Sequence, residues 1–152
     1  MAVVYDVPAT AFVVQAGQKL KETGKVVAPE WAADVKTGTH RQYPPTQQDW
    51  YYTRCASIMR RIYIDGPVGV QRLRSLYGGK KNRGARPNRH ERSGGSIIRD
   101  ALQQLDKAGF VKSVKGGRIV TPQGLAFMDK VATEMVAAKP AAEKQATPEA
   151  QT

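Results

Sequence analysis

Two stretches of the sequence carry side chains that could bind phosphates and exposed bases. In the first, Trp50, Arg54, Ser57 and Arg61 recur at helical spacing and form one stripe of a predicted helix. Arginine offers a planar fork of donors to phosphate, and an indole offers a face on which a base can stack. The stripe therefore indicates a nucleic-acid surface. A solvated basic face with Trp50 at the edge of the core is the alternative, and these residues alone do not decide between the two.

The second stretch is a glycine-rich segment, residues 78–95, in which cations outnumber acids. The single acid is Glu91, and the six cations are Lys80, Lys81, Arg83, Arg86, Arg89 and Arg92. Because like charges repel, we expect a basic loop that is poorly ordered until a phosphate-rich partner neutralises it. A flexible solvated loop without a partner is the alternative.

Hydrophobic periodicity predicts the elements that position these side chains. The strongest predicted helix runs from Asp49, a plausible N-cap, to about Ile64, and its apolar face consists of Tyr51, Cys55, Ile58, Met59 and Ile62. Further helices are expected over residues 11–22, 68–77 and 96–108. In the last of these, Arg99 lies in the first turn, where the helix macrodipole disfavours a cation unless an anion is near.

A hairpin and a final helix follow. Residues 110–114 and 119–121 read as strands around a turn that contains Gly116 and Gly117, and Thr121 with Pro122 is typical of a helix start. This order predicts a mainly α fold, a winged-helix-like helical bundle with a small β-hairpin wing. The wing carries a third, smaller basic patch of Lys112, Lys115 and Arg118. We expect one domain over residues 1–138 and a disordered tail over 139–152, which has no aromatic residue.

Composition narrows the classes of function. The chain has 152 residues, 24 Lys and Arg against 13 Asp and Glu, and a formal net charge of +11, which favours a polyanionic partner such as nucleic acid. The only cysteine, Cys55, lies on the apolar helix face. We find no signal peptide, no membrane span, no catalytic triad, no phosphate-binding glycine motif and no metal-ligand cluster. The sequence therefore predicts a cytoplasmic protein that is not an enzyme and needs no cofactor or metal.

Several ordered blocks of the chain resemble the e-type family of small-subunit ribosomal protein nineteen, which eukaryotes and archaea share. The resemblance covers nearly all of residues 3–137. The matching blocks are Pro29-Glu30-Trp31, Trp50-Tyr51-Tyr52-Thr53-Arg54, Ala56-Ser57, Gly69-Val70, Tyr77-Gly78-Gly79, Pro87, Leu102-Gln103 with Leu105, Gly116-Gly117-Arg118 and Thr121-Pro122-Gln123-Gly124. The opening Val4-Tyr5-Asp6-Val7-Pro8 and Ser96-Ile97-Ile98-Arg99 look like the archaeal branch.

The resemblance implies a structural protein that binds ribosomal RNA in the head of the small subunit and takes part in maturing that subunit. It implies contacts to RNA from the central helix and the adjoining basic loop, which adds Trp50, Arg54, Arg60 and Arg99 as site residues. The expected partners are ribosomal RNA and neighbouring small-subunit proteins, and the free chain is expected to be a monomer.

Two other classes of function fit parts of the pattern. A winged-helix transcription regulator would place the helix at 96–108 in a DNA groove. However, the exposed face of that helix carries acids and amides, namely Asp100, Asp106, Gln103 and Gln104, beside Arg99 and Lys107. A protein–protein adaptor with incidental charge is the other class, and its contact with RNA would depend little on salt.

Overall fold

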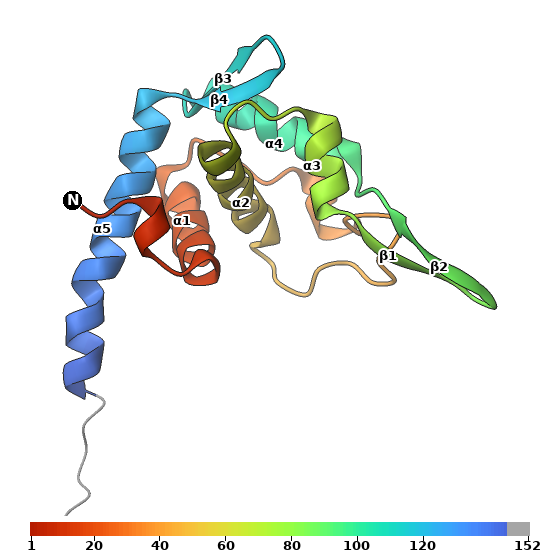
Figure 1. Cartoon of the computed structure of the whole chain (residues 1–152), viewed down its shortest axis with the longest axis horizontal. Coiled ribbons are helices and arrows are strands. Elements are labelled where there is room, and N and C mark those ends of the chain that lie inside the picture. The colour runs from red at the N-terminus through yellow and green to blue at the C-terminus, as the bar shows by residue number, and fades with distance from the viewer. Residues whose placement is uncertain (146–152) are drawn as a thin grey trace, which may run out of the picture.

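Helices dominate the fold, and two separate antiparallel hairpins extend from it (Figure 1). The computed structural model describes the chain from residue 1 to 145, and its side chains to residue 138. The α-helices are α1 (Ala9–Thr23), α2 (Trp50–Asp65), α3 (Val70–Tyr77), α4 (Gly95–Lys107) and α5 (Pro122–Gln145). The strands are β1 (Gly79–Arg83), β2 (Arg86–Glu91), β3 (Val111–Val114) and β4 (Gly117–Val120), and short 3-10 turns cover Val4–Asp6 and Glu30–Ala33.

The apolar stripe predicted for α2 forms the centre of the core. Its five members, Tyr51, Cys55, Ile58, Met59 and Ile62, are all 1% exposed or less. Helix α1 packs against α2, and Gly17 permits the close approach, since a Cβ there would lie 3.1 Å from the backbone of Thr53. Each fully buried aliphatic side chain stabilises the fold by roughly 1.5–3 kcal/mol, so this stripe fixes the position of α2.

Local signals set the helix ends as the sequence predicted, with one exception. Gly24 ends α1 in the left-handed conformation at φ 65°, and the hydroxyl of Thr121 accepts a 3.2 Å hydrogen bond from the N–H of Gly124. Asp49 occupies the N-cap position of α2, but its side chain makes no capping bond. The carboxylate instead accepts a 2.9 Å bond from Lys21 Nζ on α1.

The predicted wing is present as the hairpin β3–β4, and it is held against the helices. Its strands pair from Val111 with Val120 to Val114 with Gly117. The turn uses the two expected glycines, at φ 96° for Gly116 and φ 150° for Gly117. Val68 and Arg118 exchange two backbone hydrogen bonds of 3.2 and 3.1 Å, which tie β4 to the segment between α2 and α3.

Two predictions from sequence need correction. Residues 79–91 form the paired strands β1 and β2, where an irregular basic loop was expected, because backbone N–H and C=O groups can pair whatever the charge of their side chains. Helix α5 continues to Gln145, into the predicted disordered tail 139–152. Pro140 lacks the backbone N–H of a regular helical residue, but the alanine, glutamate, lysine and glutamine around it are strong helix formers. The rest of that tail, residues 146–152, lies outside the described residues.

Candidate nucleic-acid interface

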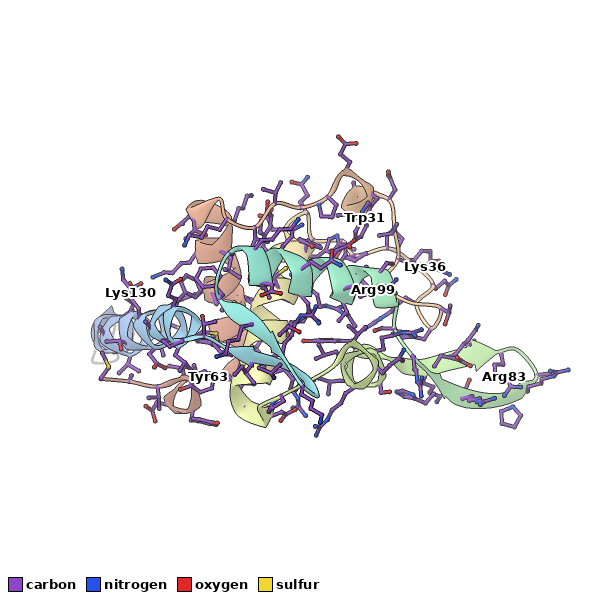
Figure 2. The ribbon with its side chains drawn as sticks, turned by 90° about the horizontal axis from the view of Figure 1, so that it is seen from above. Trp31, Lys36, Tyr63, Arg83, Arg99 and Lys130 are labelled. Carbon is purple, nitrogen blue, oxygen red and sulfur yellow. The ribbon has the colours of Figure 1, made fainter. Side chains whose placement is uncertain are left out.

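The hairpin β1–β2 projects from the helical body and carries most of the predicted cations (Figure 1). Figure 2 shows Arg83 at the far end of this hairpin, while Lys130 lies at the opposite end of the molecule. Strand pairing places Lys81 opposite Arg89 and Arg83 opposite Arg86. Like charges directly opposite each other destabilise a sheet, and an isolated two-stranded hairpin is marginal in water. An anion on this hairpin would therefore relieve a repulsion that the fold itself leaves in place.

The six predicted cations of this segment remain available to a partner. Lys81 is half-buried, and the other five, Lys80, Arg83, Arg86, Arg89 and Arg92, are exposed. None of them forms an ion pair with a carboxylate within the described residues. Arg92 donates a 3.3 Å hydrogen bond to the side-chain oxygen of Gln71 on α3, which leaves its charge uncompensated.

His40 connects the base of this hairpin to the loop that precedes α2. A Cβ on Gly38 would lie 2.7 Å from His40 Nδ1, and a Cβ on Gly79 would lie 2.9 Å from its Cδ2. The imidazole therefore sits between the two glycines, where no larger residue fits without movement. Burial, together with the charges of Arg41, His90 and Arg54, lowers the pKa of His40. The surroundings of His40 are therefore positively charged, and His40 also lines a cavity that Arg54 of α2 shares.

Trp50 does not present its indole at the surface, so the expectation of an exposed stacking face there is wrong. Its side chain is 8% exposed, and Nε1 donates a 3.0 Å hydrogen bond to the carbonyl of Ala32. The ring also packs edge to face against Tyr51, with centroids 5.9 Å apart. Trp50 anchors the start of α2 to the preceding segment. It can therefore influence a ligand only by fixing the position of α2.

Arg54 is a half-buried cation without an acidic partner. Its guanidinium lies over the ring of Tyr77, 4.3 Å from the centroid. The Tyr77 hydroxyl is in turn 2.7 Å from Ser57 Oγ, which holds the ring in place. Burial lowers the pKa of Arg54, and no carboxylate in the described residues forms an ion pair with it. A guanidinium so placed is suited to a phosphate or to the face of a base.

The remaining arginines of α2 do not join this cluster. Arg61 forms an ion pair with Asp65 one turn later, at 2.5 Å, and lines a separate depression with Arg72. Arg60 is half-buried and its Nε has no hydrogen-bond partner. The structure thus separates Arg54, which faces the loop and the hairpin base, from Arg61, whose charge is already compensated.

A second cationic depression surrounds the start of α4. It has a volume of about 740 Å³, and its charged lining residues are Lys36, Arg74, Arg89, Arg92 and the single acid Glu91. Arg99 is exposed on α4, and Figure 2 shows it on the part of that helix nearer to β1–β2. The sequence reasoning missed Lys36, His40, Arg41 and Arg74, because they come from separate segments and form no run or stripe.

Side chains suited to covalent chemistry are not available at this interface. Burial raises the pKa of the Cys55 thiol to about 12, so it stays protonated at neutral pH. Among the side chains that the structure describes, up to residue 138, no group of three or more His, Cys, Asp or Glu could hold a metal ion. Within residues 1–145, no helix combines the length and the apolar character needed to span a membrane. The side chains at this interface are chemically suited to contacts with anions and with aromatic faces.

Comparison with known proteins adds independent information. A family profile described as "Ribosomal protein S19e" matches residues 3–138. The chain is 42% identical to small ribosomal subunit protein eS19 of Aeropyrum pernix over 134 residues, which cover 86% of this chain and 88% of that protein. It is 43% identical over 134 residues to eS19A of Schizosaccharomyces pombe, covering 88% and 93%. With eS19B of Drosophila melanogaster the identity is 46% over 119 residues, covering 78% and 77%.

Proposed function

Since this chain belongs to the S19e family of ribosomal proteins, we propose that it is a structural constituent of the small ribosomal subunit. In this role it binds ribosomal RNA in the head of the subunit, lies beside other small-subunit proteins, and contributes to maturation of the subunit in the cytoplasm. The family is one of structural proteins rather than enzymes, in agreement with the prediction from sequence.

The main support for RNA binding is the positive charge of β1–β2, which no acidic side chain compensates within the described residues. Two cross-strand pairs, Lys81 with Arg89 and Arg83 with Arg86, place cation against cation at the end of a projecting hairpin. Phosphates spaced along an RNA backbone would neutralise both pairs at once and release condensed counterions. An incidental surface charge needs no such arrangement.

Apart from Arg60 and Arg61, the proposed contact residues have no acidic partner within the described residues, and all except the half-buried Lys81 and Arg54 are exposed. The hairpin contributes Lys80, Lys81, Arg83, Arg86, Arg89 and Arg92, α2 contributes Arg54, and α4 contributes Arg99. Arg60 and Arg61 remain proposed contacts from the sequence, but the ion pair of Arg61 with Asp65 weakens the case for that residue. Trp50 acts by positioning α2, because its side chain is buried.

We also infer that the central part of the fold is winged-helix-like. The supporting order is α2, the bridge at Val68, α3, α4 and then the hairpin β3–β4. In a winged helix, the segment that joins the first two helices contributes a short strand, and this strand pairs with the wing hairpin. Here Val68 lies between α2 and α3 and forms such a bridge with Arg118 of β4. The hairpin β1–β2 is then an insertion between the second and third helices of the motif.

The DNA-binding alternative receives no support from α4. In a winged-helix regulator this helix would enter the major groove. Here the side-chain oxygen of Gln104 on its outer surface accepts a 2.9 Å hydrogen bond from the backbone N–H of Val27, so the segment between α1 and α2 lies against that surface. Docking into a groove would require this segment to move away.

Sedimentation of variants tests the proposed function. The full-length chain and its variants are expressed with a small tag, and lysates are fractionated on sucrose gradients. We expect the wild-type chain to sediment with small subunits and the variant Arg83→Glu with Arg86→Glu to stay near the top. The matched control, Lys112→Glu with Lys115→Glu on the wing, should sediment like the wild type. A wild-type chain absent from the subunit fractions would contradict the proposal.

A further inference from the structure

An open cavity lies between α2 and the loop that leads into it. It has a volume of about 720 Å³, within the range of small-molecule sites in proteins. Its lining combines cationic and aromatic side chains, notably His40, Arg41, Tyr43, Arg54, Trp50 and Tyr77. No Asp or Glu lines it, although the chain has 13 such residues. The composition of the lining suits a ligand that is both anionic and aromatic.

One wall of this cavity is an ordered stack. The Ser57 hydroxyl fixes the phenol of Tyr77 at 2.7 Å, and the guanidinium of Arg54 lies on that phenol at 4.3 Å from its centroid. Arg54 and Tyr77 both line the cavity, so a planar ring that enters it can reach the guanidinium from that side. An arginine plane is a standard platform for an unstacked base.

The free-energy cost of holding the Arg54 cation in this position also favours binding of a ligand. The guanidinium is partly removed from water and forms no ion pair within the described residues, and Arg41 lines the same cavity with a second positive charge. A desolvated cation beside another cation is unfavourable unless an anion or a polarisable ring compensates it. A base stacked on Arg54, with its phosphate near Arg41, would supply both.

We propose that this cavity binds one unpaired nucleotide of an RNA, with its base stacked on Arg54 over Tyr77. The inference deepens the proposed function, on which it rests, by assigning a base-recognition pocket beside the phosphate-binding hairpin. A bare phosphate would leave most of the cavity empty. An acidic peptide would satisfy the charge but not the planar stack.

The first test uses three RNA hairpins that differ at one position: fully paired, with a single bulged adenosine, and with an abasic bulge. Their affinities for the full-length chain are measured by fluorescence anisotropy at one salt concentration. We expect about tenfold tighter binding of the bulged adenosine than of the abasic bulge, because stacking of one base on a protein platform has about that effect. The abasic RNA keeps the backbone distortion, so the comparison isolates the base.

The second test changes the platform without changing charge. Arg54→Lys keeps the cation but removes the plane, so it should abolish the preference for the bulged adenosine over the abasic bulge. Arg72→Lys, the matched control at an exposed position on α3 outside the proposed interface, should keep the preference. If Arg54→Lys does not fold, 2-aminopurine at the bulge replaces this comparison, and its fluorescence should fall when the wild-type chain stacks it.

The outcomes separate the pocket from the function on which it rests. Salt-sensitive binding of all three RNAs with equal affinity would overturn the pocket and leave the proposed function standing. A folded Arg54→Lys variant that keeps the preference would overturn the stacking on Arg54, as would unchanged 2-aminopurine fluorescence. If an Asp- and Glu-rich peptide bound more tightly than the bulged RNA, the cavity would be assigned to a protein partner instead. Failure to bind any RNA would overturn both proposals.

Discussion

The two hairpins of this protein share a topology and differ in what holds them. The hairpin β3–β4 has Val111 buried, and its backbone is bonded to Val68. In the hairpin β1–β2, five of the six residues of β2 are exposed, and cations lie opposite cations. Packing stabilises the first, whereas little in the chain itself stabilises the second beyond its own backbone bonds and the contact of His40 at its base.

This contrast separates a hairpin that the fold stabilises from one that, under the proposed function, serves binding. A hairpin that served the fold would bury apolar residues on one face, as β3–β4 does. A hairpin with uncompensated positive charge along its length is instead suited to contact an anionic partner, which would neutralise that charge.

A methyl group at the tip of each hairpin should have unequal effects. At Gly117, a Cβ would lie 2.6 Å from the carbonyl carbon of Val68 and the residue has φ 150°, so Gly117→Ala should destabilise the protein by about 3 kcal/mol. At Gly84, φ is 71° but nothing lies within 4 Å, so Gly84→Ala should cost about 1 kcal/mol, confined to β1–β2. Chemical denaturation measures both, and equal losses would remove the contrast.

Reversing one charge on β1–β2 should move stability and affinity in opposite directions. Arg89→Glu places an acid opposite Lys81, which should stabilise the free protein by about 0.2–1 kcal/mol. The same change should weaken RNA binding, because it replaces a phosphate contact with a repulsion. Thermal melting and an RNA titration on one preparation test this. A loss of stability would show that the like-charge pair is not a liability of the free fold.

Acid should weaken the base of β1–β2 before it weakens the body. The pKa of His40 is lowered from its ordinary 6.5, mainly by burial and then by Arg41, His90 and Arg54. The unfolded chain therefore takes up this proton first as the pH falls below 6.5, so the stability contribution of His40 is complete above that pH and declines below it. A proton NMR titration of the His40 ring should give a midpoint below 6.5. A midpoint at or above that value would contradict the packing described at Gly38 and Gly79.

Truncation after Ala138 should have the smallest effect of all. The removed residues include two lysines, Lys139 and Lys144, and two glutamates, Glu143 and Glu149, so the net charge of the interface is unchanged. We expect the melting temperature to stay within about one degree, since a change of about 1 kcal/mol would shift it by about 2–4 degrees in a chain of this length. A larger fall would show that the end of α5 packs against the body.

Sequence patterns predicted the body of the molecule well, because burial leaves a periodic trace. The apolar stripe of α2, the glycines of the wing turn and the cap at Thr121 were all found from spacing and residue type. The same spacing misplaced Trp50, which lies one step from the apolar stripe. Whether such a boundary residue is buried depends on a neighbouring segment, here the carbonyl of Ala32, that helical periodicity does not report.

The hairpin β1–β2 was missed because it lacks the usual signals of a strand. Its residues are mostly charged, β2 contains Pro87, and no apolar residues alternate along it. The one usable signal was Gly84 between Arg83 and Arg86, a residue that permits positive φ in a tight turn. The cavity was not predictable either, since His40 and Arg41 reach Arg54 only through the tertiary arrangement of the loop.

The salt dependence of RNA binding tests most directly whether β1–β2 is the phosphate-binding surface. The measurement compares the wild-type chain with two double variants. The first combines Lys81→Gln with Arg89→Gln on β1–β2, and the second combines Lys112→Gln with Lys115→Gln on the wing. Each protein is titrated with one structured RNA at several salt concentrations. The log–log slope should become shallower by about 1.4–1.8 for the β1–β2 variant, since each lost phosphate contact removes roughly 0.7–0.9, and should not change for the wing variant. A β1–β2 variant with the wild-type slope, or a wild-type chain whose affinity does not respond to salt, would contradict the account.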